Sequence, residues 1–173
     1  PSPPIDEQDL IVLTVGSGAT EIIASEPVLY GITWSPDGEH IAYAGGARDH
    51  YEVYVIGADG GTPMNVSRDP LGAAGPSWSP DGKSLVFRSS RRTRNGMYWY
   101  APSDGTTRLV TNRPPVEDNG GVIWPGGAGV CVTPAREPQP SVECLSSDGT
   151  RSAEAGDCLP DVERERRRCL RVT

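Results

Sequence analysis

The sequence predicts an all-β protein built from repeated units of four antiparallel strands. The phrase Trp-Ser-Pro-Asp-Gly occurs at 34–38 and again at 78–82, so its two copies lie 44 residues apart. A second marker, Asp-Gly, recurs at 59, 104 and 148. A period of about 40–45 residues that contains several short strands is typical of a β-propeller, in which each repeat forms one blade. Residues that recur once per blade are therefore expected to shape the blade before they take part in chemistry.

Both markers have the composition of tight turns. In Ser-Pro-Asp-Gly, proline presets the φ angle of the second turn position, and glycine tolerates the left-handed conformation at the end. Asp-Gly between two strand-like runs is typical of a hairpin. We expect Trp34 and Trp78 to pack between neighbouring blades. The residues predicted to have structural roles in the blades are Trp34, Pro36, Asp37, Gly38, Asp59, Gly60, Trp78, Pro80, Asp81, Gly82, Asp104, Gly105 and Trp124.

Short apolar runs between the turns predict four strands, a to d, in each unit. The runs at 41–44 and 51–56 are rich in the β-branched and aromatic residues that strands prefer. Residues 1–8 are expected to be a linker or a mature N-terminus, followed by a partial propeller of about three and a half blades over 9–173. The predicted units are strands c and d of blade 1 at 9–25, blade 2 at 31–67, blade 3 at 75–111, and blade 4 at 121–173 with an insertion at 151–168.

This pattern resembles the WD40-like (PD40-type) repeat of TolB-like β-propellers. The resemblance rests on Trp-Ser-Pro-Asp-Gly, the apolar strand after it, and the aromatic strand that ends in Asp-Gly. It extends over roughly residues 9–150 and is strongest in the two central units, whereas the next unit keeps only Trp-Pro-Gly-Gly at 124–127. It implies a docking platform for partner proteins in the cell envelope. Only the blade scaffold matches, so the resemblance assigns no functional residue.

The four cysteines lie within the last 43 residues, at Cys131, Cys144, Cys158 and Cys169. They form no Cys-x-x-Cys pair, and the chain has only two histidines, so no zinc site is expected. Disulfides are expected instead, which implies an oxidising compartment, periplasmic or secreted. Three connectivities are open. Neighbouring strands of one blade favour Cys131–Cys144, which leaves Cys158–Cys169 to close the insertion.

Composition excludes several classes of function. A net charge of −7 argues against nucleic-acid binding, and no apolar run approaches the ~20 residues of a membrane span. No Gly-x-Ser-x-Gly, P-loop or dinucleotide motif is present, so we predict no catalytic residue, cofactor or metal. Arg91, Arg92 and Arg94 form a basic cluster between strands b and c of blade 3. It is expected to be a solvated loop and is the candidate partner-binding element.

The number of blades is too small to close a ring, because propellers have typically four to eight. The chain is therefore a fragment of a longer propeller, pairs with a second copy, or docks on a different protein that covers its open edges. The leading prediction is a non-enzymatic, extracytoplasmic module for protein interaction or assembly. One alternative is the propeller of a prolyl-oligopeptidase-type peptidase, whose catalysis would lie in a separate domain. Another is a structural subunit of an extracellular assembly that pairs through open strand edges.

Overall fold

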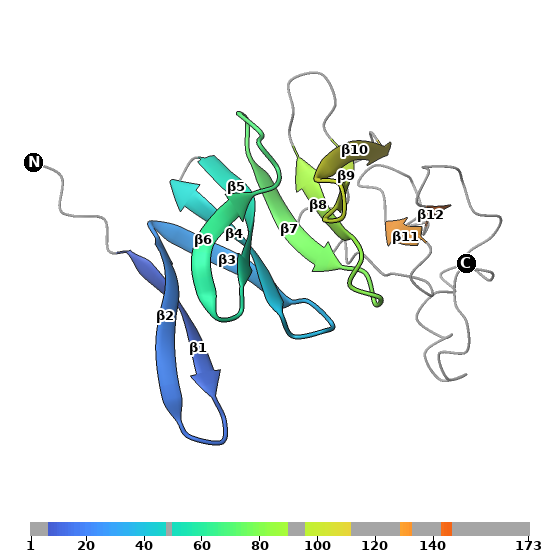
Figure 1. Ribbon diagram of the computed structural model, residues 1–173. Helices are drawn as coiled ribbons and strands as arrows, with labels where there is room; N and C mark the ends of the chain where they lie inside the picture. Colours follow the sequence, from blue (N-terminus) through green and yellow to red (C-terminus); the bar gives the residue numbers. More distant parts are fainter. Residues whose placement is uncertain (1–6, 48–49, 90–95, 112–128, 133–142, 147–173) are drawn as a thin grey trace, which may run out of the picture.

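The computed structural model describes residues 7–47, 50–89, 96–111, 129–132 and 143–146. Every regular element among these residues is a β-strand, and all pairings between them are antiparallel. Figure 1 shows two four-stranded sheets side by side, flanked by a two-stranded hairpin at each end. The predicted all-β class, with four-stranded antiparallel blades in a partial propeller, is confirmed.

The two central sheets repeat one plan, in which each strand pairs with the next along the chain. The first sheet, blade 2, comprises β3 (Val28–Trp34), β4 (His40–Ala47), β5 (His50–Gly57) and β6 (Gly60–Asn65). The second sheet, blade 3, comprises β7 (Ala73–Trp78), β8 (Leu85–Ser89), β9 (Gly96–Ala101) and β10 (Thr106–Thr111). Tight turns join β3 to β4, β5 to β6, β7 to β8 and β9 to β10, as expected for antiparallel neighbours.

The flanking hairpins are half blades within the described residues. At one end, β1 (Gln8–Thr14) pairs with β2 (Ala19–Glu26). At the other, β11 (Gly129–Val132) pairs with β12 (Glu143–Ser146), and this register sets Cys131 opposite Cys144. The backbone thus has the strand pairing on which the predicted Cys131–Cys144 disulfide depends, while the disulfide itself stays a prediction. Other predicted features lie outside the described residues: Arg91, Arg92, Arg94, Trp124, Cys158, Cys169 and the insertion at 151–168.

A glycine bulge recurs in the first strand of each central blade. Gly31 has φ 63° and Gly75, 44 residues later, has φ 64°. Each lies in an irregularity of the ladder, between Tyr30 and Thr33 in β3 and at the matching place in β7. A left-handed φ of this kind suits glycine, which has no Cβ to clash. The bulge is therefore a property of the repeat and was not among the predicted markers.

The core lies between the sheets. One face of blade 2 packs Ile41, Tyr43 and Ile56 against Leu10 and Ile23 of the hairpin β1–β2. The opposite face of blade 2 packs against blade 3, in a cluster of Ala42, Val53, Val55, Val66, Ala73, Trp78, Leu85, Phe87, Tyr98 and Tyr100. Because side chains alternate between the two faces of a strand, one sheet can contribute to two cores. Blade 2 is thus stabilised by both of its described neighbours.

Cross-strand aromatic pairs recur with the same period. Tyr43 of β4 stacks on Tyr54 of β5, with ring centroids 5.5 Å apart and planes at 20°. In blade 3, Phe87 and Tyr98 stack at 6.2 Å and 16°. Aromatic pairs of this kind add to the stability of a sheet beyond the area they bury. The stacked pairs hold the middle strands of both blades in register.

The Ser-Pro-Asp-Gly segments form capped turns. In the turn between β7 and β8, the Gly82 N–H donates to the Ser79 carbonyl at 2.9 Å, and the Ser79 hydroxyl donates to Asp81 Oδ1 at 2.6 Å. Asp81 Oδ1 also accepts the Lys83 N–H at 3.1 Å. The turn between β3 and β4 has the same bonds, with Asp37 in the place of Asp81. Both aspartates therefore act within their own turns.

These bonds lower the pKa of the Asp81 carboxyl, first through the Ser79 hydroxyl and then through the Lys83 N–H. Replacing Ser79 with alanine is expected to raise that pKa toward its ordinary value. A pKa lowered in the folded state adds stability above the unfolded pKa, and this stability is lost as pH falls through the folded pKa. A ¹³C NMR titration of the Asp81 carboxyl measures the change. Ser103→Ala, in an exposed turn, is the control and should leave the Asp81 pKa unchanged; an equal pKa in the Ser79→Ala protein would contradict the assignment.

Candidate functional site

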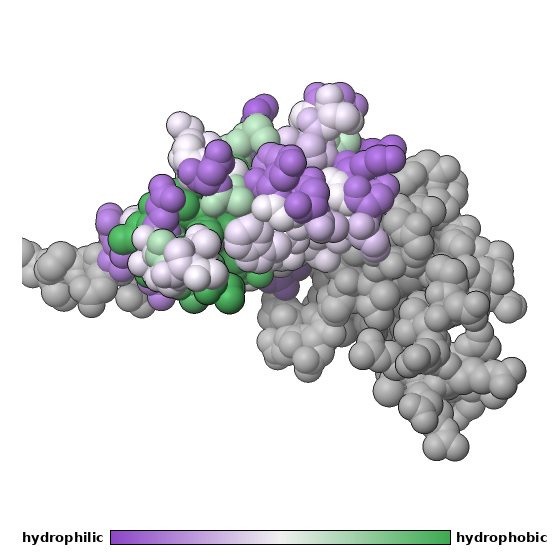
Figure 2. All heavy atoms as spheres, turned by 60° about the horizontal axis from the view of Figure 1, so that its bottom comes forward, coloured by the Kyte–Doolittle hydropathy of each residue, from purple (hydrophilic) through white to green (hydrophobic). Residues whose placement is uncertain are grey.

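The end of the molecule formed by β1, β2 and β3 exposes large apolar side chains. On the hairpin, Ile11 and Ile22 are directly opposite each other, and both are more than half exposed, as is Leu13. On β3, Ile32 is 50% exposed and Trp34 is 48% exposed. Figure 2 shows that apolar surface gathers at this end of the described structure. Exposed apolar patches on a soluble protein commonly mark an interaction site.

The repeat itself shows what such a surface is shaped to contact. Tyr30, Ile32 and Trp34 of β3 correspond, at the period of 44, to Ala74, Pro76 and Trp78 of β7. The three residues of β7 are all buried, with Trp78 only 8% exposed. They are buried because β7 packs against β3, β4 and β5 of blade 2. The corresponding face of β3 meets β1 of a hairpin that supplies two strands rather than four.

Trp34 therefore departs from the expectation that it packs between blades, whereas Trp78 does pack there. Each of the two residues is followed by the same Ser-Pro-Asp-Gly turn. The difference comes from the neighbouring sheet. Strands β3 and β4 lie beside Trp78, whereas no described strand lies in the corresponding place beside Trp34. The edge of β1 opposite β2 also has no partner strand among the described residues. An open edge beside an apolar face is a surface that other strands can extend.

A polar network fastens the loop between β6 and β7 to both central blades. Glu52 Oε2 accepts the Ser67 hydroxyl and the Asp69 N–H, the latter at 2.9 Å. The Asp69 carboxyl is fully buried; its Oδ1 accepts the Leu71 N–H at 2.9 Å, and its Oδ2 accepts the hydroxyl of Ser89 in β8. Sequence reasoning missed this network because no motif links residues 15 to 20 positions apart. Its bonds tie blade 2 to blade 3.

His50 joins this network at its surface. Its Nε2 lies 3.5 Å from Glu52 Oε1, and its side chain is 40% exposed. The other histidine, His40, is exposed on the turn side of blade 2, 6.5 Å from Trp78 between ring centroids. The two histidines thus lie at opposite ends of β4 and β5 and are not brought together.

Asp37, Glu39 and His40 bring their side-chain ligand atoms within 4.8 Å of one another on the turn after β3. All three residues are exposed. Asp37 Oδ1 already accepts the Ser35 hydroxyl and the Glu39 N–H. The cluster is consistent with a solvated, capped turn.

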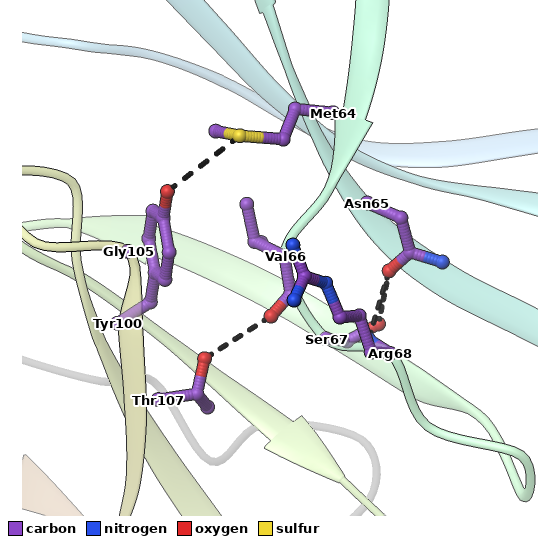
Figure 3. A pocket seen from close by; sticks show the side chains of 8 residues that line it. All are labelled: Met64, Asn65, Val66, Ser67, Arg68, Tyr100, Gly105 and Thr107. Atoms are coloured by element: carbon purple, nitrogen blue, oxygen red, sulfur yellow. Dashed lines mark hydrogen bonds between the residues drawn. The ribbon is translucent and has the colours of Figure 1, made fainter.

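A pocket of about 250 Å³ lies between the outer strands of blades 2 and 3. Figure 3 shows β6 and the start of the following loop on one side, and β9, β10 and the turn between them on the other. The Thr107 hydroxyl donates to the Val66 carbonyl at 3.2 Å, which joins the two blades across its floor. The Tyr100 hydroxyl contacts Met64 Sδ at 3.9 Å. Arg68 is the cationic residue of the lining, and no sequence signal singled it out.

The family follows from the repeat just described. A family model of the TolB β-propeller domain matches residues 6–152. The chain belongs to the TolB β-propeller domain family. The resemblance seen in the sequence is thereby confirmed. No match was found among curated proteins.

Solved structures share the fold of this TolB β-propeller domain. TolB from Acinetobacter baumannii superposes with a TM-score of 0.61 at 20% identity, over 83% of this chain and 36% of that one. Oligogalacturonate lyase from Vibrio parahaemolyticus gives a TM-score of 0.63 at 18% identity, over 83% and 41%. A puromycin hydrolase gives 0.57 at 18% identity, over 79% and 23%. The chain thus spans less than half the length of each.

The remaining predicted residues of this TolB β-propeller domain lie in turns. Gly60 begins β6 after the turn that holds Asp59, and Gly105 precedes β10 with Asp104 beside it. Asp104 Oδ1 accepts the N–H and the hydroxyl of Thr106 at 2.9 and 2.7 Å. Within the ranges that the structure describes, no helix has the length and apolar character needed to cross a membrane.

Proposed function

We propose that this TolB β-propeller domain is a non-enzymatic module that acts outside the cytoplasm and binds protein at the end formed by β1, β2 and β3. One observation carries the proposal. Residues of β3 that are exposed have copies in β7 that are buried by a neighbouring blade. The surface is therefore built for a blade that the described hairpin supplies only in part.

The chemistry of this end favours a protein partner over a small molecule. It combines an open strand edge, which can form main-chain hydrogen bonds, with tryptophan, tyrosine and aliphatic side chains, which are suited to protein interfaces. The partner would continue the sheet beside β1 and cover Trp34 as blade 2 covers Trp78. A second copy of the chain or a different protein can do this. The extracytoplasmic site is supported by the disulfides expected among the four cysteines.

Light scattering of the purified chain tests this proposal. We expect a mass that is a multiple of 18.4 kDa at high protein concentration. Trp34→Glu is expected to return the mass to 18.4 kDa, because a carboxylate would be buried without a partner in the contact. Leu71→Glu is the matched control: Leu71 is 46% exposed but lies in the loop between β6 and β7, and this variant should associate like the original chain.

A mass of 18.4 kDa at every concentration would contradict assembly with a second copy. The proposal then requires a different protein that binds the original chain and fails to bind the Trp34→Glu variant. A partner that binds both equally would contradict the surface assignment.

A second candidate is the propeller of a peptidase, favoured by the fold shared with a puromycin hydrolase. The match extends over 23% of that chain, and a separate domain would have to supply catalysis. Among the described residues, Glu52 lies between Ser67 and His50: its carboxylate accepts the Ser67 hydroxyl and lies 3.5 Å from the His50 imidazole. A serine hydrolase needs the imidazole, rather than the carboxylate, next to the serine hydroxyl. Hydrolysis of an aminoacyl p-nitroanilide by this chain alone would overturn the non-enzymatic proposal.

A structural subunit of an extracellular assembly is the third candidate and would use the same open edge.

A further inference from the structure

Arg68 has an unusual backbone conformation. Its φ is 43°, and it is the one non-glycine residue with positive φ among the described residues. This region is unfavourable for a side chain with a Cβ, and glycine or asparagine is the ordinary choice. The Asn65 side chain stabilises it, because Asn65 Oδ1 accepts the Arg68 N–H at 2.8 Å. A residue kept in a strained conformation where glycine would fit better suggests that its side chain has a role.

The Arg68 side chain lies at the pocket between blades 2 and 3. Figure 3 shows its guanidinium beside Val66, on the side of the pocket that faces Tyr100 and Thr107. Arg68 forms no ion pair with any described residue. Asp104, next to Gly105 of the lining, is engaged in its own turn by Thr106. The guanidinium therefore keeps its planar set of donors for another group, a geometry that matches a carboxylate.

Tyr100 supplies a second donor on the opposite wall. Its hydroxyl points to the thioether of Met64, which is a weak acceptor, so a stronger acceptor can replace that contact. Burial raises the pKa of Tyr100, and although Arg68 acts in the opposite direction, the net effect keeps the hydroxyl protonated at neutral pH. A pocket of about 250 Å³ with two donors has room for a group of the size of one acidic side chain.

We propose that this pocket binds the carboxylate of an acidic residue in a polypeptide, held by the Arg68 guanidinium and the Tyr100 hydroxyl. The site lies between β6 and β9–β10, and it does not depend on the function proposed for the end formed by β1, β2 and β3. Arg68 is exposed and the net charge of the chain is −7, so the attraction for an acidic group is local to Arg68. An acidic side chain would bind at this one position, against the charge of the whole chain.

An NMR titration of the ¹⁵N-labelled chain tests the proposal. The probes are the peptide acetyl-Ala-Glu-Ala-amide, its isosteric partner acetyl-Ala-Gln-Ala-amide, and sodium acetate. We expect the Glu peptide to shift the amide signals of Asn65, Gly105 and Thr107. The affinity of the Gln peptide should be lower by about tenfold or more, because it lacks the charge. The Glu peptide should bind more tightly than acetate if the ligand is a polypeptide. Equal binding of acetate would instead identify a free small carboxylate and overturn the polypeptide source.

Two substitutions separate binding from folding. Arg68→Gln is expected to lower the affinity for the Glu peptide by about tenfold or more, to the affinity of the original chain for the Gln peptide. Arg68→Gly is expected to lose binding equally while its thermal midpoint stays the same or rises, since glycine suits φ 43°. Arg108→Gln is the matched control, because Arg108 lies over the Trp99 ring at 5.6 Å and outside the pocket lining. Equal shifts with both peptides, or full binding by the Arg68→Gln protein, would overturn the proposal.

Discussion

Alanine in place of Trp78 is expected to lower the free energy of unfolding by about 3–5 kcal/mol, the usual cost of removing a buried tryptophan from a core. Trp78 is 8% exposed and packs in the cluster that joins blades 2 and 3. The same substitution at Trp34 should cost about 1 kcal/mol, since a side chain that is 48% exposed gives up much less packing. Urea unfolding followed by circular dichroism measures both values, at a concentration where the chain is monomeric.

The Trp78→Phe protein tells packing apart from hydrogen bonding. Trp78 Nε1 is buried and has no hydrogen-bond partner among the described residues. Phenylalanine would therefore lose no hydrogen bond and would keep most of the apolar area, so its cost should be well below that of alanine. Equal costs for the alanine variants at Trp34 and Trp78 would contradict the description of the end formed by β1, β2 and β3 as uncovered.

Alanine in place of Asp69 is expected to cost about 3 kcal/mol, because one buried and one partly buried donor would lose their acceptor. These donors are the Leu71 N–H and the Ser89 hydroxyl, and Asp69 itself has no exposed surface. Asp69→Asn should cost less. Its amide oxygen can still accept from Leu71, and the Ser89 hydroxyl can turn to accept from the amide nitrogen.

A double-mutant cycle measures the link between the two blades. Ser89→Ala alone is expected to cost less than Asp69→Ala, since it removes one of the two donors. The coupling free energy of Asp69 with Ser89 should be about 1–2 kcal/mol. Additive costs, with no coupling, would show that the Ser89 hydroxyl does not stabilise the loop between β6 and β7 through Asp69.

Most of the strand arrangement could be predicted from sequence, because turn chemistry is local. Proline and glycine in the two Ser-Pro-Asp-Gly turns set the backbone, and the serine and aspartate side chains cap it. The spacing of 44 then places equivalent strands in neighbouring sheets. The bulge at Gly31 and Gly75 has the same spacing and was a signal available in the sequence.

The pocket and the buried network could not be predicted in the same way. Arg68 and Tyr100 are 32 positions apart, and Asp69 and Ser89 are 20 apart, with no motif that connects them. Their proximity results from the packing of blade 3 on blade 2. The predicted partner-binding arginines and the second cysteine pair fall outside the described residues.

Sequence alone determined that this chain is made of propeller blades, because a repeated turn phrase dictates a repeated backbone. Tertiary structure alone decided what each copy of that phrase does. Trp34 and Trp78 are followed by the same Ser-Pro-Asp-Gly turn, yet one is 48% exposed and the other 8%. Burial depends on the strands that pack against a residue: β3, β4 and β5 of blade 2 pack against β7, whereas β1 of a two-stranded hairpin meets β3. This difference is the physical reason that the surface around Trp34 is exposed.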